Sequence, residues 1–232
     1  MPEFITYLHG LVSRCMNVVR GREGSFWEPK RASVVTLLTR SAVMEKLVYL
    51  VTNPVKDGLV ERVHQWPGVN GYSNLIKRRP MRATRPPCFF RDAGPMPASV
   101  TLDLVIPPEL GPEQEILDEL QTLVKAAEQE AVALRRKNKR PRALGRRKIL
   151  SQSWNDAPAK RRTRVRRKIN PRFASKDPVV RLEAILSYRA FLNAYRAARA
   201  LLLENKPAVF PQGTYWLVRF AGVSVGPPPE LA

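Results

Sequence analysis

Tyr49 and Asn53 are the two side chains of this sequence whose types and spacing could do chemistry. They are four residues apart in a segment with helical character, so both project from one face. A phenol with a pKa of about 10 is a weak nucleophile at neutral pH, and a nearby divalent cation would lower that pKa and polarise a phosphate. Spacing alone also fits an amphipathic tyrosine that covers a core, with Asn53 ending the helix before Pro54.

The elements that must position this pair read as helix, strand, helix. The apolar stripe Phe4, Leu8, Leu11, Cys15 and Val18 predicts a helix that ends near Gly21. Residues 33–38 (SVVTLL) are rich in β-branched side chains and predict a short strand, and Ser41 is placed to cap a second helix running to Asn53. One strand with two helices cannot close a core. We therefore expect partner strands from elsewhere in the chain, or a domain whose beginning lies upstream of Met1.

The middle of the chain is rich in proline and then turns acidic. Residues 77–112 contain eight prolines and predict a linker with one short strand at Val100–Val105. A helix is expected over about 112–136, with acids in its first turn and bases in its last, which suits the helix dipole. Its apolar positions are Ile116, Leu120, Leu123, Ala127 and Leu134.

The last third of the chain predicts a long helix and a terminal strand. Apolar residues recur at helical spacing from Val180 to Leu202, with Pro178 in the first turn and Asn205 at the end. Residues 213–225 (GTYWLVRFAGVSV) predict one strand, or two joined at Gly222.

The composition points to a polyanionic partner. The chain has 40 Lys and Arg against 20 Asp and Glu, a net charge of +20. Like charges in such excess repel one another in a compact state, and nucleic acid is the partner that most commonly offsets this repulsion. The hydrophobic content of 44% shows that the chain is not simply a disordered basic tail. Cys15 and Cys88 have no metal-ligand spacing, so we expect no zinc site, and two cysteines in a chain this long give no disulfide framework, which indicates a reducing compartment. No apolar run spans a bilayer and no signal peptide is indicated, so we expect a cytoplasmic protein without a membrane partner.

Most of the positive charge lies in residues 135–172, which we call the basic region. It holds seventeen Lys and Arg and one acid, Asp156. Such clusters neutralise phosphates without reading bases, so we expect nucleic-acid contact here. A solvated loop with no defined partner is the alternative, and Trp154 could stack on a base or pin the loop. The expected contact residues are Arg135, Arg136, Lys137, Lys139, Arg140, Arg142, Arg146, Arg147, Lys148, Lys160, Arg161, Arg162, Arg164, Arg166, Arg167 and Lys168.

Several short motifs occur in a fixed order in the first 72 residues. They are Phe4-x3-Leu8-His9, Gly24-Ser25-Phe26-Trp27, Tyr49-Leu50-Val51-Thr52 followed by NPVKDGLV at 53–60, and Trp66-Pro67-Gly68. This segment resembles the second half of the REP-associated tyrosine transposases, a family of the single-tyrosine HUH superfamily. The NPVKDGLV stretch is the most specific part of the resemblance.

The resemblance implies a function for the tyrosine. Tyr49 would attack a DNA phosphate and form a 5′-phosphotyrosine link, as in transposition of single-stranded or hairpin DNA, and Asn53 would help to hold Mg²⁺ or Mn²⁺. The superfamily often acts as a dimer, so the resemblance also implies a homodimer. Its members hold the metal mainly with a His-x-His pair on an upstream strand. This sequence has only His9 and His64, in no such pair. We expect a truncated version that lacks the metal-binding strands and does not nick DNA alone.

The fold class expected is α+β. It comprises a partial ferredoxin-like HUH domain over residues 1–76, a proline-rich linker over 77–111, and a mainly helical C-terminal part over 112–232 that contains the basic region and ends in a short strand. Two alternatives to a transposase-family DNA binder stay open. One is a non-catalytic binder of DNA or RNA acting through its basic region, and the other is a ribosome-associated protein.

Overall fold

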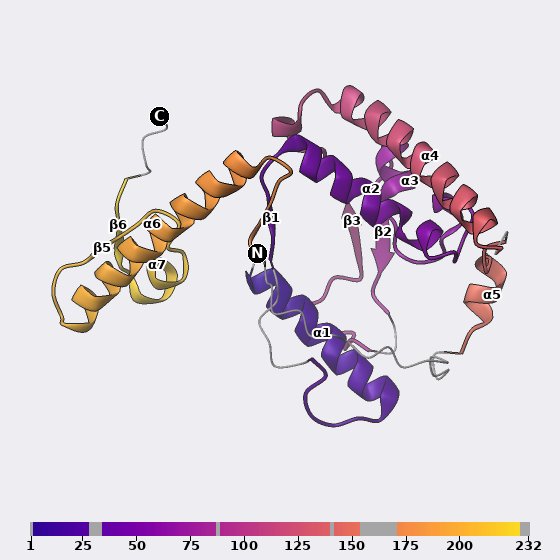
Figure 1. Cartoon of the computed structure of the whole chain (residues 1–232). Coiled ribbons are helices and arrows are strands. Elements are labelled where there is room, and N and C mark those ends of the chain that lie inside the picture. The colour runs from indigo at the N-terminus through magenta and orange to yellow at the C-terminus, as the bar shows by residue number, and fades with distance from the viewer. Residues whose placement is uncertain (1, 28–33, 87–88, 140–141, 154–170, 228–232) are drawn as a thin grey trace. The chain divides into compact units, whose positions relative to one another are not determined.

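The computed structural model describes residues 2–27, 34–86, 89–139, 142–153 and 171–227 (Figure 1). The chain forms two compact units, one of Met1–Ser33 with Met44–Lys168 and the other of Val34–Val43 with Ile169–Ala232. Helices combine with small two-stranded sheets, which makes the class α+β. None of the helices in the described ranges is long and apolar enough to cross a membrane.

Helix α1 (Pro2–Arg20) ends where the sequence predicts. Gly21 has φ +57°, and its N–H and that of Arg22 donate to the carbonyls of Val18 and Asn17, which caps the last turn. Leu11 is half-buried, but Phe4 is 64% exposed, so the expected apolar stripe is only partly covered.

Helix α2 (Arg40–Lys56) is longer than predicted at both ends. Thr39 caps it in place of Ser41, because its Oγ1 accepts from the N–H of Ala42 at 3.2 Å. Pro54 lies inside the helix and does not stop it at Asn53. A proline at this position removes one helical N–H and crowds the carbonyl four residues earlier, but the helix continues past it, and the carbonyl of Asn53 still accepts from the N–H of Asp57.

The NPVKDGLV stretch forms the end of α2. The N–H of Gly58 donates to the carbonyl of Val55 at 3.0 Å, and that of Leu59 to Pro54 at 2.9 Å. Gly58 has φ +70°, so a residue in the left-handed conformation, which glycine adopts most readily, ends this helix. Val55 and Val60, on either side of the turn, are fully buried. The most specific motif of the sequence therefore has a structural role.

The core of the first unit lies between α2 and α4 (Glu113–Lys137). Helix α3 (Tyr72–Ile76) and the short 3-10 helix Val63–Gln65 complete it (Figure 1). The helix predicted over 112–136 is confirmed, but two of its expected apolar positions, Leu123 and Leu134, are exposed. The buried face instead runs through Ile116, Leu117, Leu120, Val124, Ala127, Glu128, Ala131 and Arg135.

A β-hairpin lies where a linker was expected. Strands β2 (Met81–Thr84) and β3 (Ser99–Leu102) pair antiparallel, with Met81 opposite Leu102 and Thr84 opposite Ser99. The predicted strand at Val100–Val105 thus starts one residue earlier and ends three residues earlier. The nearby prolines cannot donate to a ladder and lie outside both strands. A 3-10 helix, Pro108–Leu110, precedes α4, and α5 (Arg146–Ser151) comes after α4.

In the second unit, β1 (Thr36–Leu37) pairs in parallel with β4 (Phe173–Ala174). The expected strand at 33–38 therefore finds its partner far along the chain. Helix α6 (Pro178–Leu203) is confirmed, and Asp177 caps it by accepting from the N–H of Val179 at 2.8 Å.

The tail of the second unit differs from the prediction. Residues Trp216–Ala221 form helix α7 and not a strand, with Gly222 at φ +60° as its C-cap. The rings of Trp216 and Phe220 lie 4.2 Å apart, centroid to centroid, on neighbouring turns. Only β6 (Ser224–Val225) is extended, in parallel with β5 (Val209–Phe210).

Candidate nucleic-acid interface

Tyr49 and Asn53 lie one turn apart on the solvent side of α2. Tyr49 is 49% exposed and Asn53 is exposed. The ammonium of Lys46 lies 5.7 Å from the centre of the Tyr49 ring, a cation–π contact. On the buried side of the helix, Thr52 and Val55 are fully buried. The phenol is therefore accessible to a large substrate.

The divalent cation that the resemblance implies would need several ligands close to Tyr49. Mg²⁺ prefers octahedral oxygen ligands, usually with a carboxylate. No cluster of three or more His, Cys, Asp or Glu able to hold a metal occurs within the described ranges. His9 stacks on Trp27, with ring centroids 4.6 Å apart, and the indole Nε1 donates to its carbonyl at 2.9 Å. His9 thus packs, and we derive no metal-dependent step.

The start of the basic region is fastened to the end of α2 by a buried arginine. Arg135, 8% exposed, donates from Nη1 to the carbonyl of Val55 at 2.8 Å and from Nη2 to the Glu61 carboxylate. The other oxygen of Glu61 accepts from the N–H of Ala143 at 2.7 Å. Arg135 was among the expected contact residues, but its guanidinium is already engaged inside the fold.

Further main-chain bonds complete this attachment. The N–H groups of Leu144 and Gly145 donate to the carbonyls of Gly58 and Leu59, at 2.9 and 2.8 Å. Ile149 of α5 packs against the core. The connection from α4 to α5 is therefore held along the helix cap of α2, and the residues around it have a fixed scaffold.

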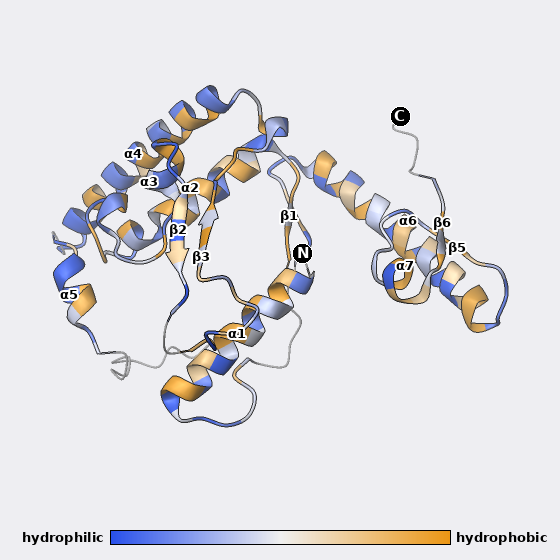
Figure 2. Ribbon diagram, turned by 180° about the vertical axis from the view of Figure 1, so that it is seen from behind, coloured by the Kyte–Doolittle hydropathy of each residue, from blue (hydrophilic) through white to orange (hydrophobic). Residues whose placement is uncertain are grey.

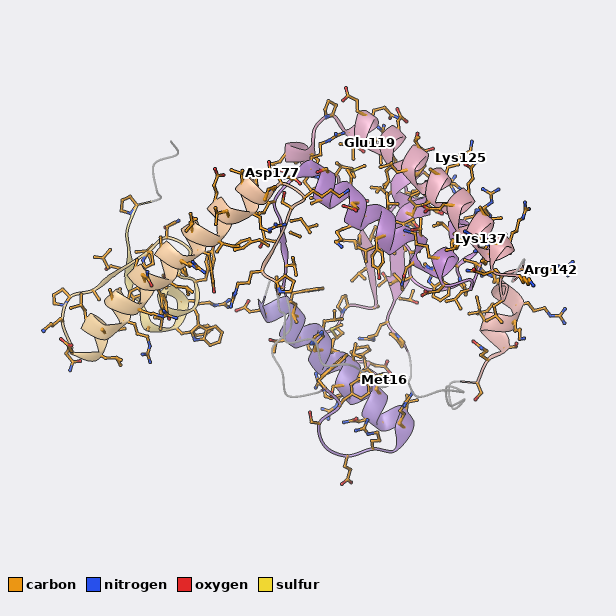
Figure 3. All side chains as sticks on the ribbon, viewed as in Figure 1. Met16, Glu119, Lys125, Lys137, Arg142 and Asp177 are labelled. Carbon is orange, nitrogen blue, oxygen red and sulfur yellow. The ribbon has the colours of Figure 1, made fainter. Side chains whose placement is uncertain are left out.

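Exposed cations surround this connection, and we call them the basic patch. None of them has an ion-pair partner among the residues that the structure describes. Figure 3 labels two of them, Lys137 at the end of α4 and Arg142 beyond it, and Figure 2 shows the hydrophilic start of α5. The members are Arg136, Lys137, Lys139, Arg142, Arg146, Arg147 and Lys148.

The other expected contact residues cannot be placed. Arg140 and the cluster from Lys160 to Lys168 lie outside the described residues, as does Trp154. The basic patch is therefore the described part of the basic region.

A second polar cluster lies beside the core. The Glu128 carboxylate accepts from the N–H of Val63 at 2.7 Å and from Nη1 of Arg62 at 3.1 Å. It borders a cavity of about 460 Å³ that also includes Tyr72 and His64. Burial raises the pKa of the Tyr72 phenol, and the charge of Glu128 adds to the shift. Because both oxygens of the Glu128 carboxylate already accept hydrogen bonds, we infer that this cluster stabilises the fold.

Sequence reasoning missed the roles of Arg135 and Glu128. Both continue the buried face of α4 at helical spacing from Val124 and Ala131. The apolar positions of α4 indicate which face of the helix is buried, but a charged residue on that face is normally expected to reach solvent. No local sequence pattern marks Glu61, because its partner Arg135 lies far along the chain on α4. Searches with the sequence and the structure find no matching family model, curated protein or solved structure.

Proposed function

We propose that this chain is a DNA-binding protein of transposase ancestry that binds single-stranded or hairpin DNA in the cytoplasm and does not cut it. The observation that carries the proposal is the basic patch, with its exposed cations on a scaffold held by Arg135 and Glu61. Cations held in place lose less entropy on meeting a phosphate than cations on a free loop.

The ancestry rests on the motifs around Tyr49. A partial ferredoxin-like HUH domain would place this tyrosine on an exposed helix face, and the exposure of Tyr49 and Asn53 agrees with that. The absence of catalysis rests on the sequence, which has two histidines in all and no His-x-His pair. A homodimer is part of the same ancestry and is proposed on that ground alone.

The electrostatics agree with binding at the basic patch. Each phosphate that a cation neutralises steepens the fall of log affinity with log salt by about 0.7 for a single strand and about 0.9 for a duplex. Four acids of α4 lie in its first two turns (Glu113, Glu115, Asp118 and Glu119), and its last turn carries three bases, Arg135, Arg136 and Lys137. A polyanion is therefore attracted to one end of that helix.

The experiment is a comparison of affinities for hairpin DNA, blunt duplex DNA and structured RNA at several salt concentrations. We expect the hairpin DNA to bind most tightly, with a steep salt dependence. Tighter binding of RNA would favour the alternative of an RNA binder. Weak binding of all three ligands at low salt would refute the proposal.

A further inference from the structure

A cavity of about 670 Å³ lies between α1 and the loop that joins β2 to β3. It is within the size range of pockets that bind small organic groups. One wall is the face of α1 that carries Tyr7, Arg14 and Asn17, and the other is formed by Phe89, Phe90 and Arg91. Met16, labelled in Figure 3, lies in the C-terminal half of α1.

The loop wall is fastened in place. Arg85 donates from Nη1 to the carbonyl of Met96 at 2.8 Å and pairs with Asp92 at 3.6 Å. Its N–H donates to the carbonyl of Ala98 at 2.8 Å. The hydroxyl of Tyr7 donates to Sδ of Met96 at 2.9 Å, which joins the loop to α1. The cavity is therefore part of the folded unit.

Its lining combines aromatic rings with positive charge. The rings of Phe89 and Phe90 meet edge to face, with centroids 4.9 Å apart, so the ring that offers its edge keeps both faces uncovered by the other. Arg14 donates a hydrogen bond from Nε to the carbonyl of Gly10. The side chain of Arg91 has no partner within the described ranges. The described residues that line the cavity include no acid.

An amide oxygen in the wall has no partner. Asn17 donates from Nδ2 to the carbonyl of Gly24 at 2.9 Å, but its Oδ1 is buried without a hydrogen bond in the part of the chain that is described. A buried acceptor of this kind is costly unless a ligand donates to it. The exocyclic amine of a nucleobase is such a donor.

We propose that this cavity binds one unpaired nucleobase of a nucleic-acid strand, stacked on Phe89 or Phe90, with the flanking phosphates held by Arg14 and Arg91. The inference rests on the proposed function, because the basic patch would hold the rest of the strand. Unpaired bases are recognised elsewhere by aromatic stacking and arginine contacts of this type. It would explain a preference for hairpins with unpaired bases over blunt duplex.

The test uses a DNA hairpin with 2-aminopurine at successive unpaired positions, since stacking quenches the fluorescence of this base. With the full chain we expect quenching at one position. The variant Phe89→Leu with Phe90→Leu should lose that quenching. It should also weaken hairpin binding by about five-fold or more, with blunt duplex binding changed by less than about two-fold. The control Phe220→Leu, in α7, should behave as the wild type.

Two further arms separate the explanations. Arg14→Gln with Arg91→Gln should reduce the salt slope for the hairpin by about 1.4. A millimolar excess of free dAMP should leave the quenching unchanged, and displacement by dAMP would show a mononucleotide site instead. If the wild type binds hairpin DNA but the phenylalanine variant matches Phe220→Leu in both assays, the cavity is not the base site. If the wild type binds no nucleic acid, the proposed function itself fails.

Discussion

The guanidinium of Arg135 on α4 donates to the main-chain carbonyl of Val55 at the end of α2, at 2.8 Å. The same group pairs with Glu61, whose second oxygen holds the N–H of Ala143. One arginine of a basic run thus fastens that run to a helix cap, and the neighbouring cations stay exposed. The structure separates the arginine that supports the basic patch from those that could bind a phosphate.

Replacing Arg135 should destabilise the first unit. Arg135→Met removes a charge-assisted pair and a hydrogen bond to a carbonyl, and leaves Glu61 without its partner. We expect a loss of about 2 kcal/mol in the free energy of unfolding, measured by urea denaturation. Arg136→Met, which changes an exposed neighbour, should cost less than about 0.5 kcal/mol. Equal effects would show that the buried contacts contribute nothing.

The cap at the end of α2 can be tested with two glycines. Gly58→Ala forces an L side chain into a left-handed conformation at φ +70°, although its Cβ would meet only Arg135 Cδ at 3.6 Å. We expect it to destabilise by about 1 kcal/mol. Gly10→Ala in α1 meets nothing within 4 Å and should stabilise by about 0.5–1 kcal/mol. Thermal or urea unfolding of both variants measures the change in the free energy of unfolding, which we expect to have opposite signs. A stabilising Gly58→Ala would contradict the role of Gly58 as a helix cap.

Several of these helix ends could be predicted because their signals are local. Gly21 and Asn205 mark the ends of α1 and α6, and both have positive φ, as residues closing a helix commonly do. The strand predicted over residues 213–225 failed because a short apolar run fits helix and strand equally, and the i, i+4 pair Trp216–Phe220 decides for helix. The partner of β1 could not be predicted, since its pairing joins residues far apart in the chain.

The candidate site was only partly readable. The charge of the basic region was evident, but nothing local distinguished the buried Arg135 from exposed Arg136. The cavity beside α1 was hidden because Phe89 and Arg91 fall in a stretch that its prolines assigned to a linker.

Tyr72 predicts a pH dependence of stability. Burial, and then Glu128, raise its pKa above the usual 10.0 in the folded protein. The folded state therefore keeps this proton at a pH where the unfolded state loses it. The stabilisation is fully present below about pH 10 and is lost as the pH rises through the raised pKa. Between about pH 9.5 and 11.5, the free energy of unfolding should fall more steeply in the wild type than in Tyr72→Phe. Identical slopes in the wild type and in Tyr72→Phe would refute the burial effect.

Tyr49 should be dispensable for stability and for DNA binding. Because it is half exposed, Tyr49→Phe should change the free energy of unfolding by less than about 0.5 kcal/mol. Incubation of the wild type with hairpin DNA and Mg²⁺ or Mn²⁺ should give no covalent adduct on a denaturing gel. An adduct that forms with the wild type and disappears in Tyr49→Phe would contradict this prediction and establish a tyrosine nuclease.

The measurement that tests the central claim is the slope of log affinity against log salt for hairpin DNA. The variant Arg146→Gln, Arg147→Gln, Lys148→Gln removes three cations of the basic patch. A matched control removes three exposed cations of α6, by Arg189→Gln, Arg196→Gln and Arg199→Gln. We predict that the slope becomes shallower by about 2 in the first variant and stays unchanged in the second. Equal changes in the two variants, or a wild-type affinity that salt does not alter, would contradict a nucleic-acid site at the basic patch.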